Sequence, residues 1–311
     1  DNIMFNKHLC KLLDLPPRFP EEPVTQEHKD LAAALQKIYE KQFLSLVETA
    51  KNITKSNNLC IGGGCAYNGV ANNLAYKYFD SIHIPFAPSD AGSAIGACLD
   101  DQTHITPFLG PSFTDKQVKK LLKPYRDSIL MFGLTEDKLI SKTAELLVSQ
   151  KTVAWFQGEM EFGARALGNR SILASPVFPT MREKLNKVIK KREGFRPFAP
   201  SVPLEDVNRF FKVSEPSPYM SKVVKSKTNL IPSATHIDQT CRVQTVTETQ
   251  NNKYYRLLKE VGRLTQIPIL LNTSFNLKDQ TITISPKQAI ERYLSSDIDF
   301  LVINNFLIRK K

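Results

Sequence analysis

Short apolar runs that end in loops and lead into helices constrain the fold of this 311-residue chain most strongly. In the first third, an apolar run at 58–61 ends at three consecutive glycines, and a helix is predicted through 70–74. A second run at 81–84 precedes a helix that begins at Asp90 and is rich in small residues. This strand–loop–helix alternation predicts an α/β fold. An amphipathic helix is predicted ahead of it at 27–50, where apolar residues recur at helical spacing.

A linker is predicted between this first part and a second part that is also mixed α/β. Residues 100–113 include Pro107 and Pro111, which interrupt any regular spacing of apolar residues typical of a helix or a strand. We therefore predict two domains, at residues 1–105 and 106–311. The second is predicted to contain strands at 152–156, 242–246, 268–271 and 300–303, helices at 135–150, 254–264 and 286–294, and a helix through 185–189 after a capping-box pattern at Thr180 and Glu183.

The charge and the cysteine content of the sequence limit the partners and the cellular compartment that can be expected. Lysine and arginine number 42 against 31 aspartates and glutamates, a net charge of +11 that suits anionic partners. Much of the excess is lysine on predicted helices, and no nucleic-acid-binding motif accompanies it, so nucleic acid is not an expected partner. No apolar run is long enough to span a bilayer, and no membrane partner is expected. Five cysteines without a CxxC pair predict a reduced, cytoplasmic protein.

The segment 157–171 carries the strongest chemical signal. It follows a predicted buried strand and combines three glycines with Arg165 and Arg170, five residues apart. A guanidinium is a planar fork that binds phosphate or carbamoyl oxygens in a bidentate manner. We interpret the loop as an oxyanion site. The alternative is a surface loop whose arginines pair with Glu159 and Glu161.

Two loops of the first part also suit ligand binding. Gly62, Gly63 and Gly64 leave main-chain N–H groups accessible, so a phosphate or an adenine ring can approach without a Cβ clash. A tight strand-to-helix turn explains these glycines equally well. Asp90 stands at a helix start, where a carboxylate is a good N-cap. The sequence by itself favours this cap over a metal or nucleotide ligand.

Three later segments hold further candidates. The cations at 190–192 end a predicted helix and are explained by its dipole, whereas Arg196, between two aromatic residues, is not. His236 stands alone, and a lone histidine is more often structural than catalytic. Asn272 and Ser274 form a polar turn after an apolar strand, and ligands of α/β sheets usually lie beyond strand carboxyl ends.

In this order and spacing, the segments resemble the family of nodulation-factor and antibiotic O-carbamoyltransferases, over about residues 4–309. The resemblance rests on the combination of 157–171, 195–200, 236–244 and 272–276. It implies the second lobe of an ASKHA-type domain followed by a YrdC-like domain. In such proteins the YrdC-like module makes carbamoyl-adenylate from carbamoyl phosphate and ATP with Mg²⁺. The ASKHA module then passes the carbamoyl group to a small-molecule hydroxyl acceptor, assisted by an iron-type divalent metal.

The resemblance also implies a role for each matching residue. It assigns nucleotide binding to Gly62, Gly63, Gly64 and Asn68, metal binding to Asp90, catalysis to Arg165, Arg170 and Arg196, and substrate binding to Arg242, Asn272, Ser274 and His236.

Departures from the family pattern limit what the chain is expected to do alone. The family metal site also requires a His-x-x-x-His pair, which this sequence lacks, and the first ASKHA lobe is absent. We therefore expect the chain neither to hold the metal tightly nor to complete transfer, and the missing lobe is an expected partner. Glu159, Ala164 and Gln280 stand where the family usually has Arg, Pro and Glu.

The predicted function is thus ATP-dependent O-carbamoyl transfer by part of a carbamoyltransferase. One alternative is a stand-alone carbamoyl-adenylate or threonylcarbamoyl-AMP synthase. The other is a nucleotide-binding remnant without catalysis. ATP consumption that depends on carbamoyl phosphate distinguishes an enzyme from the remnant, and dependence on threonine and bicarbonate indicates the threonylcarbamoyl reaction.

Overall fold

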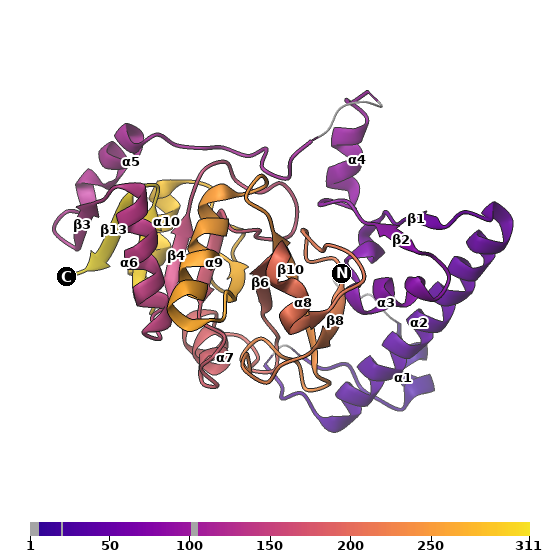
Figure 1. Cartoon of the computed structure of the whole chain (residues 1–311). Coiled ribbons are helices and arrows are strands. Elements are labelled where there is room, and N and C mark those ends of the chain that lie inside the picture. Colours follow the sequence, from indigo (N-terminus) through magenta and orange to yellow (C-terminus); the bar gives the residue numbers. More distant parts are fainter. Residues whose placement is uncertain (1–5, 20, 101–104) are drawn as a thin grey trace. The chain divides into compact units, whose positions relative to one another are not determined.

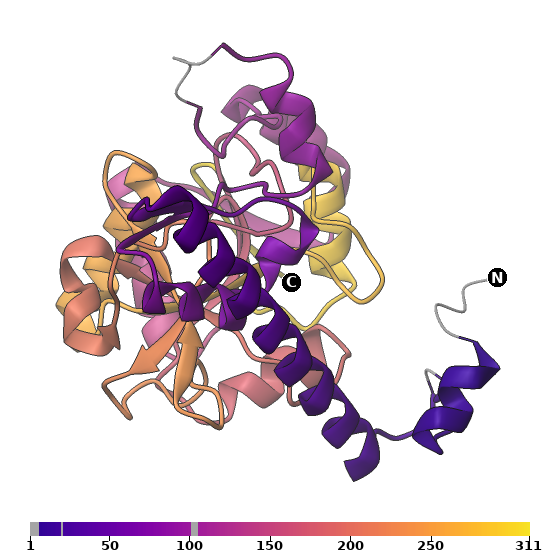
Figure 2. The ribbon, with the colours of Figure 1, turned by 90° about the vertical axis from the view of Figure 1, so that its right-hand side faces the viewer.

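The computed structural model describes residues 6–19, 21–100 and 105–311 and divides into two compact units, one ending at Ile53 and the other beginning at Thr54. The first unit contains α1 (Lys7–Leu13) and all of α2 (Gln26–Thr54) except its last residue, and α2 runs as one continuous helix (Figure 2). It confirms the helix predicted at 27–50. No helix within the described ranges is both long and apolar enough to cross a bilayer.

The second unit begins with the predicted strand–loop–helix alternation. β1 (Asn58–Cys60) and β2 (Ser81–His83) pair in parallel, with Leu59 opposite Ile82. The α/β prediction is therefore confirmed for this stretch. Its short helices are η1 (Gly64–Tyr67), α3 (Gly69–Leu74), η2 (Ala75–Lys77) and α4 (Asp90–Gly96).

A mixed sheet of eight strands, here called the large sheet, lies at the centre of the remaining described residues, in the order β10-β6-β11-β5-β4-β12-β13-β3. β10 is parallel to β6 and β12 to β4, and the other neighbours are antiparallel. Its strands are β3 (Ile129–Gly133), β4 (Val153–Phe156), β5 (Arg170–Ala174), β6 (Ala199–Pro203), β10 (Gln244–Val246), β11 (Leu270–Ser274), β12 (Phe300–Ile303) and β13 (Phe306–Lys310). The helices around it are α5 (Asp115–Leu122), η3 (Lys123–Tyr125), α6 (Glu136–Val148), α7 (Met181–Glu183), η5 (Leu204–Asp206), α8 (Val207–Phe210), α9 (Asn252–Thr265) and α10 (Pro286–Leu294).

Helices cover both faces of the large sheet because its central strands are apolar on both sides. In β4, Val153 and Trp155 join the apolar cluster formed with α6 and α9, which pack side by side (Figure 1). Ala154 and Phe156 join the opposite cluster, to which α5 and α10 contribute. Successive side chains of a strand point to opposite faces, and a continuous apolar run is typical of a strand buried on both. The predicted strand at 152–156 is confirmed on this basis.

The strand predicted at 242–246 is wrong as a single element. The chain forms β9 (Thr240–Arg242), which pairs with β8 (Val223–Ser226), and β8 also pairs with β7 (Phe211–Lys212). After Val243 it joins the large sheet as β10, where Gln244 lies opposite Ser201 of β6. The chain therefore changes sheets at Val243, and Arg242 and Gln244 belong to different sheets. We call β7–β8–β9 the small sheet.

The predicted capping box at Thr180 and Glu183 is also wrong. Thr180 makes no side-chain cap bond; its hydroxyl accepts from Gln150 at 3.2 Å, and Glu183 pairs with Lys187 at 2.7 Å. α7 continues into η4 (Lys184–Ile189), a π-helical segment. π-Helical turns are rare and often accompany functional sites.

Buried polar contacts join the β1–β2 region to the residues around the small sheet. Asn72 donates to the Ser221 carbonyl at 3.0 Å, and Glu215 pairs with Lys222 at 2.8 Å while accepting from Tyr76. The proposed domain division at residues 105 and 106 stays a prediction. Residues 101–104 of the predicted linker lie outside the described residues.

Candidate functional site

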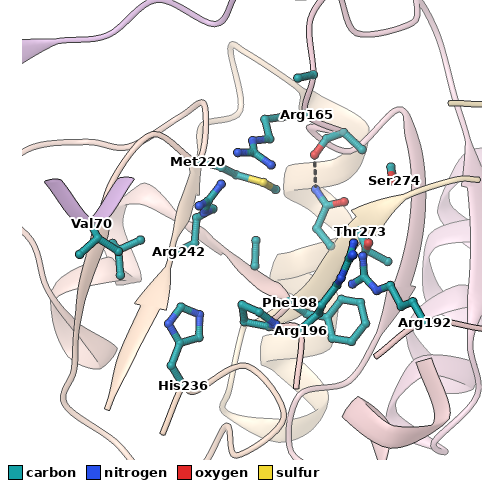
Figure 3. A pocket seen from close by; sticks show the side chains of 16 residues that line it. Val70, Arg165, Arg192, Arg196, Phe198, Met220, His236, Arg242, Thr273 and Ser274 are labelled. Carbon is teal, nitrogen blue, oxygen red and sulfur yellow. Dashed lines mark hydrogen bonds between the residues drawn. The ribbon is translucent and has the colours of Figure 1, made fainter. Parts of the chain in front are cut away.

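A cavity of about 500 Å³ opens where the carboxyl end of β11 meets the small sheet and the loop after η4. Its lining comes from segments that lie far apart in the sequence (Figure 3). We call this cavity the arginine pocket. The predicted residues that line it are Arg165, Arg196, His236, Arg242, Asn272 and Ser274, and Arg192 joins them.

Arg165 and Arg242 carry the strongest electrostatic signal in the arginine pocket, and both point into the same space (Figure 3). Burial lowers the pKa of Arg165, and burial together with the charge of Arg165 lowers the pKa of Arg242 to about 10. Within the described residues neither guanidinium pairs with a carboxylate, and Nε of Arg165 is buried without a hydrogen-bond partner. Two neighbouring, half-buried cations without a counterion favour an anionic ligand.

Arg192 and Arg196 extend the positive charge along the wall. Arg196 forms an ion pair with Glu193 at 2.8 Å, and its side chain is half-exposed. Arg192 donates from Nε to Asn186 at 2.8 Å and lies over the Phe198 ring. Sequence reasoning missed Arg192, because a cation at a helix end has a sufficient explanation in the helix dipole. Its place in the motif that contains Arg196 is the signal that points to it.

Arg170 does not line the arginine pocket. Its side chain is completely buried and lies over the Phe156 ring, 3.6 Å from the centroid. The guanidinium donates to main-chain carbonyls of Gln157 at 2.5 Å and Pro111 at 2.7 Å, and to those of Asn169 and Gly158 at 3.1 Å. These contacts make Arg170 an organiser of the 157–171 loop, and they give no support to its predicted contact with substrate.

Glu161 holds the same loop from inside, and the alternative of a surface loop with arginine–glutamate pairs is wrong for this residue. The carboxylate is buried and accepts main-chain N–H groups of Leu167 and Asn169 at 2.7 Å and of Arg170 at 3.1 Å. Gly168 within the loop has φ +110°, which suits glycine. The loop is thus rigid, and Arg165 projects from it into the arginine pocket.

Asn272 and Ser274 lie on β11 itself rather than in a turn after it. Asn272 donates from Nδ2 to the Ala166 carbonyl at 3.2 Å and to Gln244 at 2.9 Å, while its buried Oδ1 has no protein partner. The Ser274 carbonyl accepts from Lys190, whose Nζ also contacts the carbonyl of Asn276 at 2.9 Å and its Oδ1 at 2.7 Å. Lys190 therefore fixes the end of the strand that carries two pocket residues.

Lys190 is a buried cation that sequence reasoning explained only as a helix-end charge. Burial and the charges of Arg192 and Arg292 lower its pKa to about 7. Three oxygen acceptors around Nζ match the three protons of an ammonium group. The local geometry thus favours the charged form, while desolvation opposes it.

The hydrogen bonds around His236 fix its tautomer. Asp238 Oδ1 accepts from the Thr240 hydroxyl at 2.6 Å, so that hydroxyl accepts in turn from Nδ1 of His236 at 2.9 Å. Burial is the largest effect on the pKa of His236 and lowers it. The neutral ring then keeps a lone pair on Nε2, which is buried without a protein partner, and the residue lines the arginine pocket.

The predicted nucleotide and metal residues lie outside the lining of the arginine pocket. Gly63 has φ +84° and donates its main-chain N–H to Pro88 at 2.6 Å, and Asn68 caps α3 by accepting from Ala71 at 3.3 Å. Gly62 and Gly64 are exposed beside it. These contacts explain a tight turn and leave the nucleotide role a prediction.

Asp90 is not the N-cap that the sequence favoured: Ser89 occupies the cap position, and Asp90 is the exposed first residue of α4. Within the described ranges, no group of three or more histidine, cysteine, aspartate or glutamate side chains is arranged to hold a metal ion. A single exposed carboxylate does not make a transition-metal site, so these residues do not by themselves fit the family metal. The metal role of Asp90 stays a prediction for a longer protein.

Comparisons with known proteins place the chain in a family. The family model described as carbamoyltransferase C-terminus matches residues 144–310, and the model described as carbamoyltransferase N-terminus matches residues 4–99. An uncharacterised protein of Synechocystis sp. is 36% identical over 346 residues, covering 99% of this chain and 56% of that protein. The nodulation protein NolNO of Sinorhizobium fredii is 38% identical over 308 residues, covering 93% of this chain and 45% of that protein.

A solved structure, HypF of T. kodakarensis, matches 75% of this chain and 35% of its own, at 16% identity and a TM-score of 0.37. The chain spans about half the length of the curated relatives that it matches.

Proposed function

The chain belongs to the carbamoyltransferase family, and we propose that its arginine pocket binds carbamoyl phosphate as the donor for ATP-dependent O-carbamoylation. The proposal assigns the phosphate group to Arg165 and Arg242, with Arg192 and Arg196 available to the phosphates of ATP. Ser274 and His236 are assigned to the polar wall beside the ligand. Arg170 is assigned to the loop and not to the reaction.

One observation carries the proposal: two half-buried guanidiniums, those of Arg165 and Arg242, line one pocket without a carboxylate partner among the described residues. Carbamoyl phosphate suits this pocket, because its phosphate accepts hydrogen bonds from arginine. Its carbamoyl group carries N–H donors and a carbonyl acceptor, and the polar side chains that line the pocket beside the arginines can pair with both. The lining therefore fits a ligand that is an anion at one end and a polar amide at the other.

The proposed chemistry activates the carbamoyl group with ATP. Water cleaves carbamoyl phosphate to carbamate and phosphate. A carbamate oxygen then attacks the α-phosphorus of ATP, and the bond to pyrophosphate breaks to give carbamoyl-adenylate. Both reactants are polyanions, so fixed guanidiniums stabilise the charge that collects in the transition state. Mg²⁺ that arrives with ATP supplies further positive charge at the phosphates.

Transfer to an acceptor hydroxyl is proposed to need the part of the family proteins that lies outside this chain. The glycines Gly62, Gly63 and Gly64, with Asn68, are proposed to contact the nucleotide in that larger protein. Asp90 is proposed to contribute one ligand to its metal. That part of the family proteins is also proposed to select the small-molecule acceptor.

The test is release of pyrophosphate from ATP and Mg²⁺, with and without carbamoyl phosphate. We expect release only when carbamoyl phosphate is present. Arg242→Ala should lower the rate roughly a hundredfold, since loss of one preorganised charge costs about 3 kcal/mol in comparable sites. Arg263→Ala is the matched control, because Arg263 is an exposed arginine on α9 away from the pocket lining, and its rate should stay within about twofold of wild type.

Two outcomes overturn the proposal in favour of the alternatives. Pyrophosphate release that requires threonine and bicarbonate instead of carbamoyl phosphate identifies a threonylcarbamoyl-AMP synthase. ATP binding without release under either condition identifies a nucleotide-binding remnant.

A further inference from the structure

The side chain of Arg165 contacts Tyr67, an aromatic residue that stands outside the lining of the arginine pocket. Its guanidinium lies over the Tyr67 ring, 5.4 Å from the centroid. Tyr67 ends η1, directly after the three glycines, and both side chains are half-buried. Among the described residues Arg165 forms no ion pair, and its Nε is buried without a hydrogen-bond partner. The Tyr67 ring thus gives this guanidinium an attractive contact that needs no ligand.

Arg165 needs such a contact because it shares the arginine pocket with another cation. Arg242 lines the same pocket, and its charge repels that of Arg165. Like charges repel each other more strongly in a partly desolvated space than in water, so without an attractive contact Arg165 would turn away from Arg242. The face of an aromatic ring attracts a guanidinium. Unlike a carboxylate, a neutral ring does not neutralise the positive charge, which stays available to an anion.

Buried contacts of the surrounding main chain hold the ring in place. Ala66 is 2% exposed, and its carbonyl accepts from Asn72 Nδ2 at 2.7 Å. The same Nδ2 donates to the carbonyl of Ser221, which precedes β8 of the small sheet, at 3.0 Å. A Cβ on Gly69 would lie 3.2 Å from that Ser221 carbonyl, so α3 begins in close contact with this segment. The position of Tyr67 is therefore set by its backbone and not by the arginine that it contacts.

From these contacts we infer that Tyr67 is a positioning residue, which holds Arg165 in the orientation that binds the phosphate of the ligand. The inference rests on the proposed function, and it gives the β1–β2 region a part in the arginine pocket. Ordering one flexible side chain on binding lowers affinity by about twofold to tenfold, and a side chain that is already ordered avoids this loss. If Tyr67 only filled space, the effect of replacing it would not depend on Arg165.

A double-mutant cycle on the full chain separates these two roles. The dissociation constant of carbamoyl phosphate is measured by calorimetry for wild type, Tyr67→Leu, Arg165→Ala and the double variant. Tyr67→Leu should weaken binding roughly fivefold when Arg165 is present, and less than about twofold when it is already alanine. Tyr67→Phe keeps the ring and should bind within about twofold of wild type.

Two controls address the fold. Tyr78→Leu removes another half-buried ring of the β1–β2 region, one that does not line the pocket and lies beside Lys77, and it should bind like wild type. If Tyr67→Leu fails to fold, Tyr67→Met takes its place with the same expected result.

The outcomes distinguish the inference from the proposed function. Tyr67→Leu that binds like wild type, or that weakens binding equally with and without Arg165, overturns the inference alone. Tyr67→Phe that binds as weakly as Tyr67→Leu does the same, because the ring is then not the cause. Failure of wild type to bind carbamoyl phosphate overturns the proposed function, and the cycle is then run with inorganic phosphate, for which the inference predicts the same result. If wild type binds neither anion, both are wrong.

Discussion

Arg165 and Arg170 lie five residues apart in one loop, but their surroundings give them different roles. Arg170 begins β5, so its side chain enters the protein and donates to main-chain carbonyls. Arg165 projects from the middle of the loop, lies 5.4 Å from the Tyr67 ring and lines the arginine pocket. Neighbouring arginines of one motif are therefore expected to respond differently to mutation.

Replacing Arg170 with Met should destabilise the fold by at least about 3 kcal/mol, because several buried carbonyls lose their donor together. Urea unfolding followed by circular dichroism measures the change. Arg165→Met is the matched control, since Arg165 donates to no main-chain carbonyl among the described residues, and the free energy of unfolding should fall by less than about 1 kcal/mol. Equal unfolding midpoints for the two variants would show that Arg170 does not organise the loop.

Lys190 should make stability depend on pH. Its pKa is lowered to about 7 in the folded chain, from 10.5 when solvated, so the unfolded chain binds more protons between these values. The contribution of Lys190 to the free energy of unfolding is fully present above about pH 10.5, and it is lost as pH falls towards about 7. The free energy of unfolding of wild type, relative to Lys190→Met, should therefore rise with pH from 7 to 10, with a limiting slope of about 1.4 kcal/mol per unit.

The comparison needs a second lysine variant. Lys187 is exposed one turn earlier, and Lys187→Met should leave the pH dependence of wild type unchanged. A difference between wild type and Lys190→Met that stays constant with pH would contradict the assignment of Lys190 as a desolvated cation.

At the scale of elements, periodicity identified the helices and strands whose burial follows a regular pattern. α2, α6, α9 and α10 were predicted because apolar residues recur on one face, and β4 and β12 because their apolar runs are continuous. β5 was missed because it begins with a buried arginine and serine, which resemble loop residues until the acceptors of Arg170 are known. The break at Val243 was missed because it depends on which strands the two halves meet.

The packing of α9 against the 157–171 loop gives a prediction for an element contact. A Cβ on Gly168 would lie 2.3 Å from the Tyr254 ring, and the residue has φ +110°. Gly168→Ala should therefore cost about 2–4 kcal/mol of stability, through steric overlap and backbone strain. Gly96→Ala is the control, because nothing lies within 4 Å of its Cβ position, and it should change stability by less than about 1 kcal/mol. Thermal unfolding of both variants measures the change. An unfolding midpoint of Gly168→Ala equal to that of wild type would contradict the close packing of Tyr254 on the loop.

At the scale of the whole molecule, the pocket brings together motifs that the sequence presents separately. Arg165, Arg196, Arg242 and Asn272 were predicted individually, and the fold places them around one cavity. Their common location could not be predicted from spacing, because β11 lies between β5 and β6 only after distant segments pair. The Asn272 amide also donates to a residue 28 positions away. Sequence alone thus identifies residues that line the pocket but not the directions of their hydrogen bonds.

The central claim is that the arginine pocket binds carbamoyl phosphate, and calorimetric titration of that ligand tests it most directly. Arg242→Ala should weaken binding by about 1.5–3 kcal/mol, because the ligand loses a charge-assisted contact in a desolvated site. Arg263→Ala, which removes the same charge from an exposed position on α9, should bind within about twofold of wild type. Equal dissociation constants for wild type and Arg242→Ala would contradict the claim.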